Sequence, residues 1–284
     1  MIAMSTFRIE TLGCKVNQCD SRRLAECLLE LGLREASETE TPDICVVNTC
    51  TVTHRADRKG RQLIRQFHRE NPSTRLFVTG CYARDNPEDL DELPGVEGVF
   101  SPDQWDELFN ALSSKRPGGS GGRASHFGHA SFPRRDRAFL KIQDGCDFYC
   151  NYCIVPHVRG EPRSRDPRNA RKEARRLIEA GAREIVLTGI HLGLYGRDLK
   201  AEVDLARIVR SLADLDGLGR LRLSSVEALE VNDRLLDAMA HPAVCPHLHL
   251  PLQSGDDSVL KAMGRRYTGS EFATRVETAR RHLY

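Results

Sequence analysis

Short apolar runs alternate with amphipathic segments along most of the chain. In the first part, the apolar runs predict strands near residues 7–12, 44–47, 76–79 and 96–100, with helical patterns between them, the first over residues 21–31. Regular alternation of strand and helix is typical of a parallel α/β sheet. We therefore expect residues 1–113 to form an open parallel sheet covered by helices.

The same alternation returns in the second half of the chain. Strands are predicted near residues 138–142, 184–187, 220–224 and 247–250, with helices between them. The spacing fits the βα units of a barrel. Four parallel strands do not close a barrel. We therefore expect a partial (β/α) barrel that is incomplete at its C-terminus, in a chain that is a fragment or a truncated domain.

A change in composition separates the two halves. Residues 115–122 contain four glycines and one serine, next to a proline and two basic residues. Such a segment is typical of a flexible linker. The prediction is an N-terminal domain over residues 1–113, a linker over 114–136 and a second domain over 137–284.

The composition excludes some classes of protein and leaves others open. Hydrophobic residues make up 40% of the 284 residues and charged residues 29%, enough for each domain to build a core. No apolar run approaches the roughly 20 residues of a membrane span, and the first residues lack the pattern of a signal peptide. We therefore expect a cytoplasmic protein with no membrane partner. A net charge of +2 does not by itself indicate a nucleic-acid partner.

Ten cysteines in a reducing compartment indicate metal binding or catalysis. Three of them, Cys14, Cys50 and Cys81, each follow a predicted strand of the first domain. The carboxyl ends of parallel strands lie on one edge of a sheet, where ligands bind, so these thiols should converge. Three thiolates suit an iron–sulfur cluster or zinc. The alternative is three buried cysteines that act as small hydrophobic residues.

A second group of cysteines is more specific. Cys146, Cys150 and Cys153 form a C-x3-C-x2-C pattern directly after the first predicted strand of the second domain. Most four-iron clusters take four cysteines, so three ligands leave one iron open to a further molecule. The alternative is a zinc knuckle completed by His157, although no second C-x2-C pair supports it.

This second pattern resembles the radical S-adenosylmethionine (SAM) superfamily, in which three such cysteines hold a [4Fe–4S] cluster whose open iron binds SAM. The aromatic residue before the last cysteine, Tyr152, lies near the adenine of SAM in that superfamily. Further segments resemble the methylthiotransferases within it. These segments are residues 11–17, 48–53, 79–83, 140–146, 154–156, 163–165, 185–191, 224–227 and 247–255.

The resemblance implies a fold, a reaction and cofactors. The fold is a Rossmann-like methylthiotransferase domain followed by a radical SAM barrel. The cofactors are SAM and two [4Fe–4S] clusters, one on Cys14, Cys50 and Cys81 and the other on Cys146, Cys150 and Cys153. The reaction is transfer of a methylthio group to C2 of an adenosine next to the tRNA anticodon. A ring C–H there is unactivated, so no side-chain base removes its proton, and the cofactors supply radical chemistry instead.

The segments around Cys14, Cys81 and Thr188 are most similar to members that act on N6-threonylcarbamoyladenosine. The alternatives are members that act on N6-isopentenyladenosine in tRNA or on a ribosomal-protein aspartate, and a truncated, inactive iron–sulfur protein. The resemblance further implies a sulfur source and an electron donor such as a flavodoxin or ferredoxin. The candidate contacts to SAM are Tyr152, Thr188, Gly189, Ser225, Glu227 and Gln253. All of them except Tyr152 are also explicable as cap or loop residues.

Basic residues cluster locally although the total charge is nearly balanced. The stretches 54–75 and 159–176 are rich in arginine, as expected either for solvated helix faces or for a surface that follows a phosphate backbone. An arginine pair next to Tyr267 suits an unpaired base. The candidate RNA contacts, from the tRNA anticodon loop, are Arg159, Arg163, Arg165, Arg265 and Arg266.

Overall fold

The computed structural model describes residues 5–113, 136–200 and 202–283. The chain divides into two compact units, Met1–Ser131 and Phe132–Tyr284. The linker predicted over residues 114–136 lies, except for its last residue, outside the described residues. The domain limits therefore stay a prediction.

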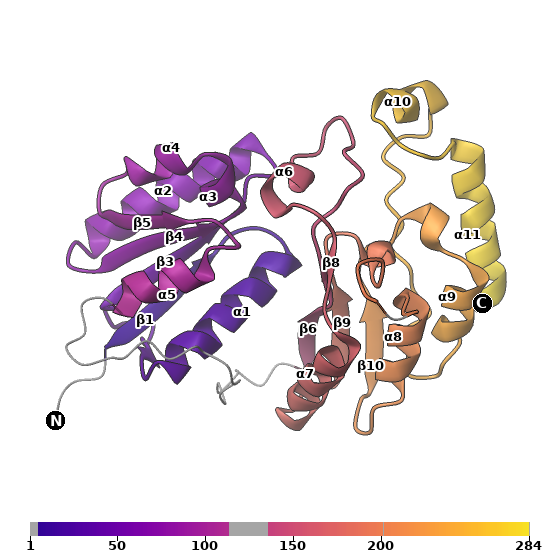
Figure 1. Cartoon of the computed structure of the whole chain (residues 1–284), viewed down its shortest axis with the longest axis horizontal. Coiled ribbons are helices and arrows are strands. Elements are labelled where there is room, and N and C mark those ends of the chain that lie inside the picture. The colour runs from indigo at the N-terminus through magenta and orange to yellow at the C-terminus, as the bar shows by residue number, and fades with distance from the viewer. Residues whose placement is uncertain (1–4, 114–135, 201, 284) are drawn as a thin grey trace. The chain divides into compact units, whose positions relative to one another are not determined.

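The first unit is built on a five-stranded parallel sheet (Figure 1). Its strands are β1 (Thr6–Thr11), β2 (Arg34–Glu35), β3 (Ile44–Thr49), β4 (Arg75–Gly80) and β5 (Val96–Phe100). Their spatial order is β2-β1-β3-β4-β5. This is the order of a doubly wound, flavodoxin-like sheet, in which the direction of winding reverses between β1 and β3.

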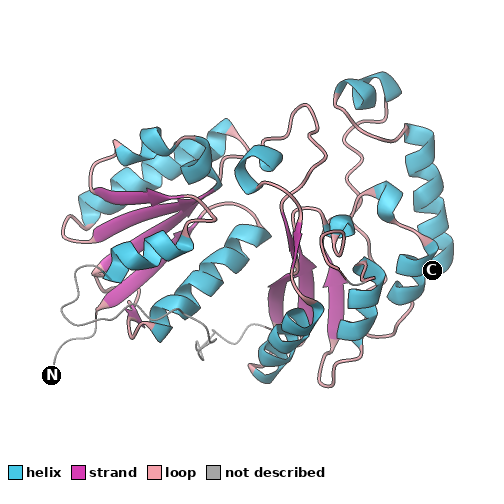
Figure 2. Cartoon of the chain, viewed as in Figure 1, coloured by secondary structure: helices cyan, strands magenta, loops and turns pink. Residues whose placement is uncertain are grey.

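Helices cover both faces of this sheet (Figure 2). One face carries α1 (Lys15–Glu30) and α5 (Trp105–Ser113), and the other carries α2 (His54–Glu70), α3 (Cys81–Asp85) and α4 (Pro87–Asp91). Successive strand residues point to opposite faces, so each strand contributes to two cores. On one face, Val46 and Phe77 pack with Leu24, Leu28 and Leu108. On the other face, Val47 and Val78 pack with Ile64, Phe67 and Leu90.

The second unit contains a parallel sheet of β6 (Arg137–Lys141), β9 (Glu184–Thr188) and β10 (Arg220–Leu223), in the order β10-β9-β6. A short antiparallel pair, β7 (Gln143–Asp144) and β8 (Arg163–Ser164), follows the end of β6. The helical elements are α6 (Val155–Arg159), α7 (Pro167–Glu179), η1 (Leu192–Leu194), α8 (Leu205–Ala213), η2 (Ala228–Glu230), α9 (Asp233–Met239), α10 (Asp257–Ala262) and α11 (Gly269–Leu283).

Side-chain caps show why several of these helices begin where they do. Asp166, Asp204, Asn232 and Asp256 each precede a helix and accept hydrogen bonds from its first backbone N–H groups. Capping of this kind is worth about 1 kcal/mol per helix.

The predicted α/β fold class, with a parallel sheet in the first part and a partial barrel in the second, is confirmed.

Two predicted elements differ from the structure. The segment 247–250 forms no regular strand: its His249 makes a single bridge to Ser225, just after β10, and the other bridge joins Leu221 of β10 to Val244, which precedes the segment. Its alternating pattern lies between Pro246 and Pro251, which have no N–H group to donate to a ladder. Helix α1 begins at Lys15 rather than near Ser21, so Cys14 stands at its N-cap.

Within the described residues, no helix is long and apolar enough to cross a membrane.

Candidate functional site

The loop that carries Cys146, Cys150 and Cys153 begins where β6 and β7 end. Gly145 opens it with a φ of +75°, and a Cβ there would lie 2.1 Å from the carbonyl oxygen of Glu161. Only glycine fits this close approach of two backbones. The Cys146 N–H then donates to the Gly160 carbonyl over 3.0 Å. The start of the cysteine loop is therefore held against residues 160–161.

The far part of the loop is held by a second segment of the same unit. The Asn151 backbone N–H donates to the Met263 carbonyl over 3.1 Å, and its side-chain amide donates to the Ala262 carbonyl over 2.7 Å. Gly264, with a φ of +72°, passes beside Asn151. The end of α10 and the residues after it are thus fastened to the cysteine loop.

All three thiols of this loop line one cavity of about 250 Å³. The rest of its lining comes from the residues that follow β9 and β10 and from the segments near Gln253 and Arg265. The lining residues are Cys146, Phe148, Cys150, Tyr152, Cys153, Val155, Ile190, His191, Ser225, Val226, Glu227, Pro251, Gln253 and Arg265. The site thus lies at the carboxyl ends of the parallel strands, where barrels of this kind bind ligands.

The donor set of this cavity suits a cluster better than a single ion. Three thiolates are soft ligands of the kind that iron–sulfur clusters take. Within the described residues, no three His, Cys, Asp or Glu side chains are gathered closely enough to hold one metal ion. A cubic cluster places its ligands on separate irons and so accepts thiols that stand farther apart. His157 is exposed and packs against Tyr149 rather than lining the cavity, which does not favour a zinc knuckle.

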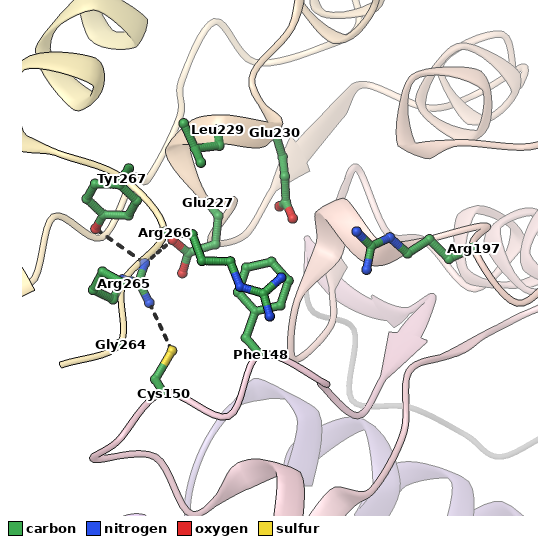
Figure 3. A pocket seen from close by; sticks show the side chains of 10 residues that line it. All are labelled: Phe148, Cys150, Arg197, Glu227, Leu229, Glu230, Gly264, Arg265, Arg266 and Tyr267. Carbon is green, nitrogen blue, oxygen red and sulfur yellow. Dashed lines mark hydrogen bonds and ion pairs between the residues drawn. The ribbon is translucent and has the colours of Figure 1, made fainter. Parts of the chain in front are cut away.

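Arg265 links the cysteine loop to a half-buried carboxylate (Figure 3). Its guanidinium pairs with Glu227 and donates to the Cys150 Sγ over 3.6 Å and to the Tyr267 Oη over 3.3 Å. Burial raises the pKa of Glu227 above its ordinary value, even though Arg265 acts in the opposite direction. A guanidinium that donates to a ligating sulfur stabilises the thiolate and helps to set the potential of a cluster.

His191 occupies the other side of the cavity. Its Nδ1 lies 3.5 Å from the Cys146 Sγ, and its Nε2 lies 2.5 Å from the Glu230 Oε1. Burial lowers the pKa of His191, but the hydrogen bonds to Cys146 and Glu230 outweigh it and raise that pKa to about 9. Its backbone N–H donates to the Gln143 Oε1 over 2.8 Å, so the buried Gln143 amide connects the cysteine loop to the end of β9.

Four of the six residues predicted to contact SAM line the cavity that holds the thiols, and two do not. Tyr152, Ser225, Glu227 and Gln253 line the cavity with the thiols. Gln253 has a φ of +70°, a conformation that costs about 1–3 kcal/mol in a residue other than glycine and is common at binding sites. The Ser225 hydroxyl lies 2.7 Å from the His249 Nδ1.

Thr188 and Gly189 do not line this cavity. The Thr188 hydroxyl is buried and donates to the carbonyl of Val186 in its own strand. Gly189 lies against the side chain of Gln143. The cavity wall from this loop is instead formed by Ile190 and His191.

The first unit holds the other cysteine triad at one edge of its sheet. Cys14, Cys50 and Cys81 follow the carboxyl ends of β1, β3 and β4, which are neighbours in the sheet. Cys50 and Cys81 are buried and Cys14 is exposed. A Cβ at Gly13 would lie 2.8 Å from that of Cys50, so the first two loops are in close contact. Their position coincides with the switch point between β1 and β3, where sheets of this order bind ligands.

A buried amide fastens these loops. Asn17, fully buried in the first turn of α1, donates from Nδ2 to the carbonyls of Leu12 and Thr49 over 2.9 and 2.8 Å. The backbone carbonyl of Asn17 accepts a hydrogen bond from the side-chain amide of Asn48. Gly80, with a φ of +101°, lies so close to Thr49 that a Cβ would stand 2.3 Å from its carbonyl oxygen. The edge that carries the three thiols is therefore densely hydrogen-bonded.

The arginines proposed as RNA contacts occupy different environments. Arg159 is 3% exposed and pairs with Asp144 over 3.3 Å, so it supports the cysteine loop from inside and is not a surface contact. Arg265 likewise belongs to the cavity wall. Arg163 and Arg266 are exposed, and Arg165 is half-buried.

Sequence reasoning did not assign site roles to His191, Gln143 and Glu230. Each acts through hydrogen bonds between segments far apart in the chain, which no local spacing reveals. Among the remaining cysteines, Cys19, Cys45 and Cys245 are buried and Cys27 is half-buried, and burial raises the pKa of the Cys27 thiol to about 11.

Comparison with known families matches residues 6–101 to the uncharacterized protein family UPF0004 and residues 140–283 to the radical SAM superfamily. The chain is 38% identical to the threonylcarbamoyladenosine tRNA methylthiotransferase MtaB of Bacillus subtilis, covering 99% of this chain and 64% of that protein. It is 36% identical to MtaB of Thermotoga maritima, covering 98% and 65%. It is 34% identical to the tRNA-2-methylthio-N(6)-dimethylallyladenosine synthase of Syntrophotalea carbinolica, covering 98% and 67%.

Among solved structures, the chain is similar to the radical SAM methyltransferase TsrM of Kitasatospora setae with cobalamin and a [4Fe–4S] cluster bound. The TM-score is 0.69 at 16% identity, over 99% of this chain and 65% of that one. That likeness shows the fold. The chain spans about two thirds of the length of the curated relatives it matches. By its two matched regions and these relatives, the chain belongs to the radical SAM methylthiotransferase family.

Proposed function

We propose that this chain transfers a methylthio group to C2 of N6-threonylcarbamoyladenosine next to the anticodon of tRNA. The single observation that carries the proposal is the cavity lined by Cys146, Cys150 and Cys153 at the strand ends of the second unit. The similarity to two proteins named MtaB supports the choice of this nucleoside. A tRNA substrate would place the activity in the cytoplasm.

The proposed cofactors are SAM and two [4Fe–4S] clusters. One cluster would be held by Cys14, Cys50 and Cys81 in the first unit. The other would be held by Cys146, Cys150 and Cys153 in the second unit. When bound, these groups supply the radical chemistry that an unactivated ring C–H requires. A sulfur source and an electron donor such as a flavodoxin or ferredoxin complete the proposal.

The chain's own residues have three tasks in this proposal. Arg265 donates to the Cys150 Sγ and so stabilises a ligating thiolate. Glu227, Ser225 and Gln253 present polar groups to a cofactor in the cavity. Exposed aromatic rings, above all that of Tyr152, offer surface on which a purine can stack.

The first experiment measures iron and acid-labile sulfide per chain after anaerobic reconstitution. Two four-iron clusters predict about eight of each. Incubation with SAM, a reductant, sulfide and an anticodon stem-loop RNA that carries N6-threonylcarbamoyladenosine should then yield its 2-methylthio derivative, detected by mass spectrometry of the digested RNA.

Each other result has a distinct meaning. About four irons per chain would show that one triad binds no cluster, and zinc or no metal at all would exclude the radical mechanism. Product only on RNA with N6-isopentenyladenosine would favour the reaction named for the Syntrophotalea relative. Variants Cys50→Ala and Cys150→Ala identify which triad holds which cluster.

A further inference from the structure

A second cavity, of about 280 Å³, adjoins the first. The two share Phe148, Cys150, Glu227 and Arg265, which line both of them. The residues that belong to the second cavity alone are Arg197, Leu229, Glu230, Gly264, Arg266 and Tyr267. Its wall therefore combines apolar surface with two arginines that the first cavity lacks.

Arg266 is the distinctive group of this cavity. Its guanidinium lies 4.2 Å from the centre of the Phe148 ring, and Figure 3 shows it spread over that ring. The side chain is exposed, and no carboxylate among the described residues pairs with it. A guanidinium packed over an aromatic ring keeps N–H groups, which lie in its own plane, available to a planar anion.

Arg197 extends toward the same space from the opposite wall (Figure 3). It lies 3.6 Å from Asp147, and 57% of its side chain is exposed, so this pair leaves N–H groups available to a ligand. The two carboxylates in the lining each pair with a group other than Arg266. Glu227 pairs with Arg265, and Glu230 is hydrogen-bonded to His191 through Oε1, while its buried Oε2 has no hydrogen-bond partner among the described residues. The positive charge of Arg266 is therefore not cancelled within the cavity.

We propose that this second cavity binds the carboxylate of the threonylcarbamoyl group through Arg266, assisted by Arg197. The inference rests on the proposed function. In the target nucleoside, C2 belongs to the same six-membered ring as C6, the carbon that carries the substituted N6. A base that presents C2 to the first cavity thus keeps its N6 substituent within reach of the adjoining one. An isopentenyl group has no charge and gains nothing from two guanidinium groups. Arg266 would then be a specificity-determining residue.

The test compares three anticodon stem-loop RNAs that differ only in the N6 substituent: threonylcarbamoyl, its methyl ester, and isopentenyl. Binding to the cluster-loaded chain is measured by fluorescence anisotropy, and product by mass spectrometry. Arg266→Ala should weaken binding of the threonylcarbamoyl RNA about 10- to 100-fold, the effect of losing a hydrogen bond to a charged group. It should change binding of the other two RNAs less than about twofold. Arg266→Lys should fall between, because a lysine keeps the charge without the planar fork.

Two controls isolate the effect. Arg207→Ala removes an exposed arginine of α8 that lines neither cavity, and should change nothing. SAM binding, measured by equilibrium dialysis, should be unchanged in Arg266→Ala. A lower affinity for SAM would assign the arginine to the cofactor and overturn the inference.

The RNA results decide between carboxylate and phosphate. If Arg266→Ala weakens all three RNAs equally, the arginine contacts the RNA backbone and the inference is wrong. It is also wrong if the unaltered chain binds the threonylcarbamoyl RNA no better than the ester. A clear binding preference without methylthio product would instead contradict the proposed function and leave the inference standing.

Discussion

The two cysteine triads reach a sheet edge by different routes. In the second unit a single loop of eight residues carries all three thiols to one cavity. In the first unit the thiols come from three loops, after β1, β3 and β4, and one is exposed while two are buried. A site on one loop depends on local backbone conformation, whereas a site on three loops depends on the register of the whole sheet.

Each unit nevertheless uses the same device to hold its cysteine loops. One buried amide side chain bonds to backbone groups of segments far apart in sequence, Asn17 in the first unit and Gln143 in the second. An amide suits this task because it both donates and accepts. The comparison predicts that the two triads can be disabled separately.

The largest expected effect is loss of one whole cluster. Cys150→Ala and Cys50→Ala should each lower the iron content of the reconstituted chain from about eight to about four, since each removes one of three ligands. Methylthio transfer should be abolished in both. Cys45→Ala, which alters a buried thiol inside β3, is the matched control and should keep both the iron and the sulfide. Iron and sulfide analysis would contradict the separation of the triads if either variant lost all of its iron.

Substitution of the two buried amide side chains, Asn17 and Gln143, should have the next largest effect. Asn17→Leu leaves the carbonyls of Leu12 and Thr49 without this donor. In the second unit, Gln143→Met leaves the Gly145 carbonyl without a donor and the His191 backbone N–H without an acceptor. Each unpaired buried group costs about 1–3 kcal/mol.

To measure the iron bound at each triad separately, each amide variant is combined with a variant that disables the other triad. Asn17→Leu is combined with Cys150→Ala, and Gln143→Met is combined with Cys50→Ala. Iron at the remaining triad should then fall well below four per chain. Gln66→Met, an exposed amide paired with Glu70, is the control and should leave the iron unchanged. Full iron in the Asn17 variant would show that the first triad does not depend on this amide.

A smaller effect is expected at the glycines. Gly80→Ala would place a Cβ 2.3 Å from a carbonyl oxygen of Thr49, and Gly145→Ala one 2.1 Å from that of Glu161. Both glycines have positive φ, so each substitution should lower the free energy of unfolding by about 1–3 kcal/mol. Gly255→Ala, whose Cβ would meet open space, is the control. Equal melting temperatures for all three variants would show that the loops adjust freely.

How much the sequence reveals differs between the two sites. The C-x3-C-x2-C spacing is local, and the structure indeed brings its three thiols to one cavity. The other triad was predicted from strand ends, because strands leave a recognisable apolar pattern. The position of Cys14 at the start of α1 was not predicted, since residues 15–20 offer only Val16 and Cys19 as apolar positions and the helix there is held by the buried Asn17. His191, Gln143 and Arg266 acquire their roles only through contacts between distant segments.

The smallest expected effect concerns the opposite end of the second sheet. Glu184 of β9 lies between Arg137, Arg220 and Arg222, at 3.0, 3.8 and 3.0 Å. Burial raises the pKa of Glu184, but hydrogen bonds from Arg222 and Arg137 outweigh it and hold that pKa below its ordinary value of 4.5. A lowered pKa in the folded state means that the ionised carboxylate stabilises the fold above pH 4.5. This contribution is lost as the pH falls through the lowered value.

Glu184→Gln should therefore lower the free energy of unfolding of the second unit by about 1 kcal/mol at pH 7, and the difference should shrink to nothing as the unaltered carboxylate is protonated. Hydrogen exchange at the amides of β9 reports on this unit by itself. Glu179→Gln, an exposed glutamate of α7, is the matched control and should shift stability by less than about 0.5 kcal/mol at any pH. A destabilisation by Glu184→Gln that stayed constant down to acid pH would assign its effect to packing, because only a charge on the carboxylate is removed by protonation.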